Sequence, residues 1–149
     1  MTRLGLACAA ILGAAGCSGA APVTALPDPV TLARPAEYSF GDATRKKDSA
    51  AERAANAILV ERLGRRAIPD VSYWVASRDT DLAALRRDYD ARAAAGGWRA
   101  VDGFAARLGA GRSGFAYVGG GGAFAILWLD AVSASGRRSV TVLRYSAEG

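Results

Sequence analysis

The chain of 149 residues has no histidine and only two cysteines, Cys8 and Cys17. Without histidine there is no serine–histidine–aspartate or cysteine–histidine catalysis, and the usual ligand of catalytic zinc is missing. Both cysteines lie near the N-terminus, so the rest of the chain contains no thiol and no disulfide. We therefore expect a domain that holds neither a metal nor a cofactor.

The first 16 residues have the pattern of an export signal. Arg3 supplies a positive charge, and residues 4–15 follow with no polar side chain. This apolar run is shorter than the roughly 20 residues that a membrane-spanning helix needs. The pattern predicts that the chain is exported and that residues 1–16 are removed as a signal peptide.

The apolar run ends in Leu12-Gly-Ala-Ala-Gly16-Cys17. This stretch resembles the lipobox of bacterial lipoproteins, in which small residues precede the cysteine that becomes the mature N-terminus. The resemblance covers about 17 of 149 residues. It implies that Cys17 receives a diacylglycerol and that signal peptidase II cleaves before it. Two or three acyl chains hold a protein stably on a membrane, because each buried methylene contributes about 0.8 kcal/mol.

The same resemblance implies a location in the cell envelope, on the periplasmic side of a membrane. Ser18 follows the cysteine, where an aspartate would resemble an inner-membrane retention signal, so the outer membrane is favoured in a cell with two membranes. The alternative is ordinary cleavage after Ser18-Gly-Ala20, a site with small residues. That cleavage would release a soluble periplasmic or secreted protein.

Basic residues exceed acidic ones, with 19 Lys and Arg against 14 Asp and Glu and a formal net charge of +5. Such an excess often indicates a nucleic-acid partner, but an exported protein does not meet nucleic acid. We expect the membrane as a partner through the N-terminal lipid. An acidic envelope protein, an anionic lipid and a glycan are the further candidates.

The mature chain divides into a tether and one domain. Residues 17–47 are rich in alanine and proline and predict a flexible tether that begins at the lipidated Cys17. Residues 37–42 within it could form a short edge strand or a hydrophobic latch. Residues 48–149 are long enough for one domain with its own core and too short for two.

Apolar periodicity predicts two helices and several strands in this domain. Ser49-Ala-Ala-Glu52 has the form of a capping box at the start of the first helix. In the second helix, Leu82, Leu85, Tyr89 and Ala93 recur on one face. The predicted helices are 49–63 and 79–95, and the predicted strands are 71–77, 98–101 continuing into 104–108, 115–118, 123–129 and 139–145.

The order of these elements predicts an α+β fold. We expect a two-layer domain in which an antiparallel sheet of four to five strands carries the amphipathic helix 79–95 on one face, with the other helix preceding the sheet. Strand 123–129 is apolar on both faces, which is typical of a central strand covered on two sides. The first helix or a partner could cover the second face.

Several motifs have a structural interpretation that we prefer to a functional one. Residues 109–114 read Gly-x-Gly-x-x-Gly, but strand-like residues follow rather than the helix that a dinucleotide site needs, so we expect a turn. The glycines 119–122 predict a hairpin tip rather than an anion site. Asp79 and Asp81 fit the start of a helix, and Asp130 fits a strand end, so we expect no catalytic role for them.

Aromatic and arginine residues offer a candidate binding surface. We propose Trp74, Trp128, Arg137 and Arg138 for it, on the condition that the rings face solvent. The pairs Arg65-Arg66, Arg86-Arg87 and Arg137-Arg138 could converge into a patch for anionic lipid, although scattered solubilising charge is the expected outcome.

The best-supported function from sequence is a non-enzymatic binding or scaffold module for another envelope component. One alternative is a hydrolase that uses carboxylates alone, which would need two carboxyl groups facing each other in a cleft. The other is a carrier of a small ligand, which would need an apolar cavity between the sheet and a helix.

Overall fold

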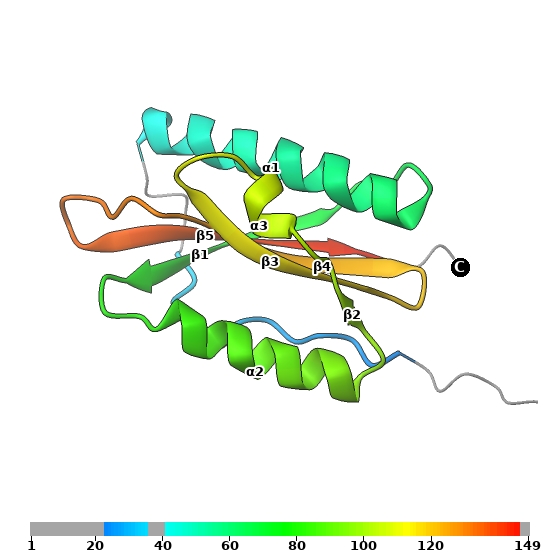
Figure 1. The fold of residues 1–149 in the computed structure, drawn as a ribbon. Helices are drawn as coiled ribbons and strands as arrows, with labels where there is room; N and C mark the ends of the chain where they lie inside the picture. Colours follow the sequence, from blue (N-terminus) through cyan, green and yellow to red (C-terminus); the bar gives the residue numbers. More distant parts are fainter. Residues whose placement is uncertain (1–22, 36–40, 147–149) are drawn as a thin grey trace, which may run out of the picture.

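A computed structural model describes residues 23–35 and 41–146 of the chain. The signal peptide, Cys17 and most of the strand expected at 37–42 lie outside the described residues. The described residues form a sheet with helices on both faces (Figure 1). The elements are α1 (Asp42–Leu63), β1 (Asp70–Ser77), α2 (Leu82–Ala95), β2 (Arg99–Ala100), α3 (Phe104–Arg107), β3 (Arg112–Gly119), β4 (Gly122–Leu129) and β5 (Arg137–Tyr145).

The sheet has five antiparallel strands in the order β1-β5-β4-β3-β2. Two hairpins join β3 to β4 and β4 to β5, whereas β1 comes from earlier in the chain and pairs with the last strand. The α+β fold with an antiparallel sheet is confirmed. β4 is the central strand, and all its residues except Trp128 are buried, as its apolar pattern predicts.

Helix α1 covers the second face of the sheet, which is one of the two predicted possibilities, so helices lie on both sides of the sheet (Figure 1). Ala51, Ala55 and Leu59 of this helix are buried in a core with small and branched residues of the sheet. Small side chains allow the helix backbone to approach the sheet closely. The residues that the sheet contributes are Ala116, Ala123, Ala125, Leu127, Leu143 and Tyr145.

Helix α2 covers the opposite face through a layer of aromatic rings. Leu82, Leu85, Tyr89 and Ala93 are buried, as their spacing predicts. The ring of Tyr89 stacks on Phe124, with centroids 5.2 Å apart and planes inclined by 18°. The sheet side of this core consists of Trp74, Ala76, Phe115, Tyr117, Phe124, Ile126, Val140 and Val142.

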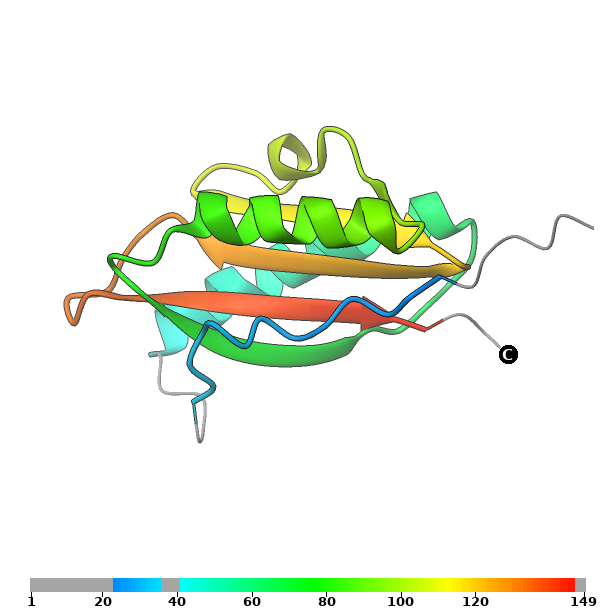
Figure 2. The same cartoon turned by 90° about the horizontal axis from the view of Figure 1, so that it is seen from below.

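Residues 23–35, which we call the strap, cover the rest of this second face. The strap runs beside α2 and crosses the face of the sheet (Figure 2), and Ala33 forms an antiparallel bridge with Val75 of the edge strand β1. Leu26 and Leu32 are buried in the same core as α2. The prediction of a flexible tether over 17–47 is therefore wrong for the strap, because its leucines fill a place that α2 leaves open.

The starts of both long helices differ from the prediction. Helix α1 begins at Asp42, seven residues earlier than expected, so the tether is also wrong for residues 42–47 and Ser49 to Glu52 lies inside the helix instead of capping it. Helix α2 begins at Leu82, and the side chain of Asp81 accepts a hydrogen bond from the amide of Ala84. Asp81 is therefore the N-cap, and the helix begins three residues later than the predicted start at residue 79.

The strand expected over 98–101 and 104–108 is mostly wrong. β2 contains only Arg99 and Ala100, and residues 104–107 form the short helix α3. Phe104 and Leu108 are both buried in the core beneath α1. Their separation of four positions is the helical spacing that places two side chains on one face, which the strand interpretation overlooked.

Candidate binding site

Polar contacts from three elements fix the strap to the domain. The indole Nε1 of Trp98 donates to the carbonyl of Thr24 at 2.6 Å, and the hydroxyl of Tyr89 donates to the carbonyl of Pro27 at 2.6 Å. The guanidinium of Arg144 lies 2.8 Å from a carboxylate oxygen of Asp28. A proline-rich extended segment has free carbonyls, and side-chain donors satisfy them here.

A cavity of about 310 Å³ lies between the start of the strap, Trp98 and the turn from β3 to β4. We call it the strap pocket. Most of the described residues that line it are apolar or glycine, and Arg144 is the charged residue among them. The lining residues are Val23, Ala25, Leu26, Trp98, Gly119, Gly120, Gly122, Ala123, Phe124, Arg144, Tyr145 and Ser146.

The charge of Arg144 in the strap pocket is already compensated. Its guanidinium carbon lies 4.9 Å from the ring centroid of Phe124, and its Nη2 also donates to the carbonyl of Leu26 at 3.3 Å. Together with the ion pair to Asp28, these contacts satisfy the guanidinium of Arg144 within the protein. The strap pocket therefore suits a small, largely apolar group better than a free anion, and its volume is at the lower end of ligand sites, about 300–1,000 Å³.

The glycines at 119–122 form the turn that closes the strap pocket. Gly120 and Gly121 have φ values of 58° and 78°, the left-handed conformation of a two-residue hairpin turn. A Cβ on Gly120 would lie 3.0 Å from the Cβ of Val23, so a side chain there would push the strap away. The hairpin-tip prediction is confirmed.

A second group of polar residues lies between α1 and the strands β1 and β5. Ser139 Oγ donates to Asp48 Oδ2 at 2.8 Å, and the hydroxyl of Tyr73 donates to Glu52 Oε1 at 3.1 Å. The hydroxyl of Tyr145 donates to Asn56 Oδ1 at 3.0 Å. We call Asp48, Glu52 and Asn56 the polar stripe. Their spacing of four residues on α1 is the sequence signal that the capping-box interpretation concealed.

Burial changes the acidity of Glu52 in the polar stripe and of its partner Tyr73. Burial raises the pKa of Glu52 above its usual value, and the hydrogen bond from Tyr73 opposes this rise. The pKa of Tyr73 rises to about 12, mainly through burial and then through the nearby negative charge of Glu52. Each carboxylate accepts a hydroxyl, so the polar stripe joins α1 to the sheet and satisfies its buried polar atoms.

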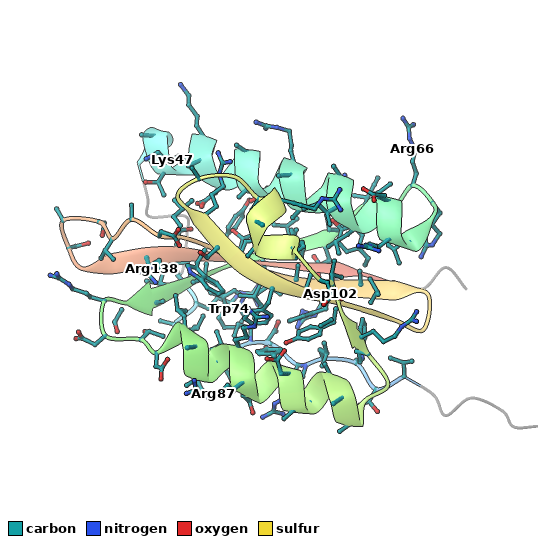
Figure 3. The ribbon with its side chains drawn as sticks, in the orientation of Figure 1. Lys47, Arg66, Trp74, Arg87, Asp102 and Arg138 are labelled. Atoms are coloured by element: carbon teal, nitrogen blue, oxygen red, sulfur yellow. The ribbon has the colours of Figure 1, made fainter. Side chains whose placement is uncertain are left out.

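The residues predicted as a binding surface lie on both faces of the sheet. Trp74 is only 6% exposed and packs between the sheet and α2 (Figure 3), so its ring belongs to the core. Trp128 is half-buried against the same core. Trp74 and Trp128 are both paired with Val140 of β5, so the three side chains lie on one face of the sheet. Because side chains alternate along a strand, Arg138 lies on this face and Arg137 on the opposite face. Arg138 Nη2 donates to the carbonyl of Asp130.

The remaining candidate motifs have the structural roles that we expected. Gly109 and Gly111 have positive φ and lead directly into β3, so the glycine-rich motif is a turn and a strand. Asp81 caps α2, and its carboxylate lies 3.5 Å from Arg87. Asp130 is exposed just after β4 ends.

Within 23–35 and 41–146, no group of three or more acidic, histidine or cysteine residues is placed to hold a metal ion. In the same ranges, no helix has the length and apolar character needed to span a bilayer. The chain matches no family model, no curated protein and no solved structure.

Proposed function

We propose that this chain is a lipid-anchored protein of the bacterial cell envelope whose domain binds or scaffolds another envelope component without catalysis. The Cys17 lipid would hold it on the periplasmic side of a membrane. The strap is the observation that carries the proposal. Val23 comes six positions after Cys17 and already contacts the fold, so the domain would remain within about 22 Å of the lipidated residue.

The arrangement of polar groups supports binding rather than hydrolysis. A hydrolase that uses carboxylates needs two of them facing a substrate. Asp48 and Glu52 are neighbours on α1, but each accepts a hydrogen bond from a hydroxyl of the sheet. The strap pocket, in contrast, is apolar and open to solvent next to the start of the strap. It is the better candidate for the recess that receives a group of the partner or a small ligand.

Substitution of the lipobox cysteine tests the anchor. We expect Cys17→Ser to accumulate as uncleaved precursor and to incorporate no radioactive palmitate, because a serine hydroxyl does not form the thioether. Cys8→Ser is the matched control, since Cys8 lies within the signal peptide, and this variant should be processed and labelled normally. Palmitate labelling of Cys17→Ser, or a mature chain that begins at Ala21, would reject the anchor.

Obstruction of the strap pocket tests the binding role. Ala25 is exposed at the strap pocket, and we expect Ala25→Trp to fill this space and remove a non-covalent partner or ligand that native mass spectrometry detects on the chain purified from membranes. Ala91→Trp is the control, because Ala91 is exposed on α2 and does not line the strap pocket. Equal loss in both variants, or retention in both, would contradict binding in the strap pocket.

A further inference from the structure

The two described chain ends meet at one end of the domain, which we call the anchor end. Val23, Ser146 and the β3–β4 turn line the strap pocket there. Arg65 Nη2 donates to the carbonyls of Gly121 at 3.0 Å and Ser146 at 2.8 Å, which joins the loop after α1 to the same end. Figure 1 shows this end on the right, where β5 ends and the strap begins.

Three arginines at the anchor end form no salt bridge with the described part of the domain. They are Arg62, Arg66 and Arg99, and all three are exposed. Arg62 and Arg99 line one cavity together with a single acid, Asp102, so positive charge is in excess there. Helix α2 differs, because its arginines at 86, 87 and 92 pair with aspartates at 90, 81 and 88. An excess of positive charge therefore remains at the anchor end, whereas the arginines of α2 are paired with aspartates.

An exposed apolar side chain accompanies these arginines. Ile68 is 94% exposed in the loop between α1 and β1, two positions after Arg66. A single exposed apolar residue is common on proteins and carries no argument alone. Next to arginines, however, it has the composition of a surface that inserts a side chain at the boundary between headgroups and acyl chains.

The length of chain before the strap determines which way the anchor end faces. Six positions separate Cys17 from Val23, which allows at most about 22 Å between them. Hydrogen bonds from Trp98 and Tyr89 hold the strap on the domain, so the link between the domain and Cys17 cannot lengthen by release of the strap. A lipid on Cys17 therefore brings the anchor end, rather than the opposite end of the sheet, to the bilayer.

We propose that the anchor end docks on the anionic lipid headgroups of the membrane that carries the Cys17 lipid. Arg62, Arg66 and Arg99 would contact phosphate groups, and Ile68 would enter the interface. This inference rests on the proposed anchoring and adds a fixed orientation to it. The domain is then held against the membrane, with the loops at Arg78 and Ser135 facing away.

The test uses the full mature chain carrying its lipid, with Ile68→Cys labelled by a polarity-sensitive fluorophore. Cys17 does not react with the label because its sulfur is in the thioether. On phosphatidylcholine vesicles that contain phosphatidylglycerol, we expect the emission to shift to the blue and brominated lipid to quench it. The same label at Ser135→Cys, an exposed residue of the β4–β5 loop, should show neither effect.

Arginine substitution separates docking from general insertion. In the labelled chain, Arg62→Gln, Arg66→Gln and Arg99→Gln together should lower the ratio of docked to undocked domain about a hundredfold, since each arginine near an anionic surface changes it about fivefold. The matched triple Arg78→Gln, Arg86→Gln and Arg87→Gln should change it little. Equal quenching in both triples, or equal emission on vesicles with and without phosphatidylglycerol, would overturn the inference.

Mass spectrometry of the same samples distinguishes the two proposals. If Cys17 carries no acyl chain, the anchor is rejected, and flotation of the unlabelled chain with anionic vesicles then measures docking alone. Flotation that depends on the three arginines of the anchor end supports docking. Flotation that ignores them overturns it.

Discussion

Glu52 shows how one buried carboxyl links stability to pH. Burial raises its folded-state pKa above the ordinary value of 4.5. A group whose pKa is raised on folding contributes its stability when protonated, below its unfolded pKa, and loses it as pH rises through the folded pKa. Ionised Glu52 therefore opposes folding at neutral pH, even though Tyr73 donates a hydrogen bond to it.

We expect Glu52→Gln to be more stable than the natural chain by an amount that grows as pH rises from about 4 to 7. The amide oxygen still accepts the hydroxyl of Tyr73, and the cost of burying a charge is removed. Urea unfolding at several pH values measures the difference between the two chains.

Glu61→Gln is the control on the same helix, and its effect should have the opposite sign. The hydrogen bond and charge of Arg107 lower the pKa of Glu61, so its contribution is present at neutral pH and lost as pH falls. If both variants show the same dependence on pH, the assignment of Glu52 as a buried acid is wrong.

Gly114 explains a motif that resembles a nucleotide-binding fingerprint. A Cβ at this position would lie 2.5 Å from the carbonyl oxygen of Ile126 and 3.2 Å from side-chain carbons of Leu108 and Leu127. The glycine is needed because β3 approaches β4 and the segment after α3 closely. The turn interpretation followed from the strand-like residues after it, but the packing reason requires the three-dimensional structure.

The strap shows why composition misled the prediction for an element. Proline and alanine indicate an extended chain, and an extended chain that makes no contact is a tether. This one is extended and buried, because Leu26 and Leu32 enter the core and side chains of the domain bind its carbonyls. Nothing local to residues 23–35 identifies those donors, which come from α2, β5 and the loop before β2.

Loss of a strap leucine should destabilise the whole domain. We expect Leu26→Ala or Leu32→Ala to lower the free energy of unfolding by about 2–5 kcal/mol, the usual cost of removing a buried leucine side chain. Chemical denaturation measures this change. Val30→Ala is the control, because Val30 is 83% exposed, and it should change the value by less than about 0.5 kcal/mol.

Unfolding of Leu26→Ala at the same denaturant concentration as Val30→Ala would show that the strap is not part of the cooperative fold. In that case, faster proteolysis of residues 23–35 would show that the leucine stabilises the strap only locally.

For the whole molecule, patterns with a clear period predicted most of the fold. The spacing of Leu82, Leu85 and Tyr89 identified the buried face of α2, and the apolar run of β4 identified the central strand. What failed depended on contacts between distant residues. Asp48 is buried because Ser139, far along the chain, donates to it, and Trp74 is buried because the strap and α2 cover the sheet.

The candidate site was less predictable than the fold for the same reason. Of the four residues proposed for a surface, three share one sheet face, but the ring of Trp74 is in the core. The strap pocket combines Val23, Trp98 and Arg144 from widely separated positions. The strap pocket forms only when the strap packs against the rest of the domain.

The position of β5 in the sheet has a consequence for biosynthesis. This last strand lies between β1 and β4, so the two halves of the sheet connect only when residues 137–145 are present. A polypeptide that crosses a membrane with its N-terminus first cannot complete this arrangement until translocation is nearly finished. If Cys17 is lipidated as we propose, the sheet would be completed only after the N-terminus is held at the bilayer.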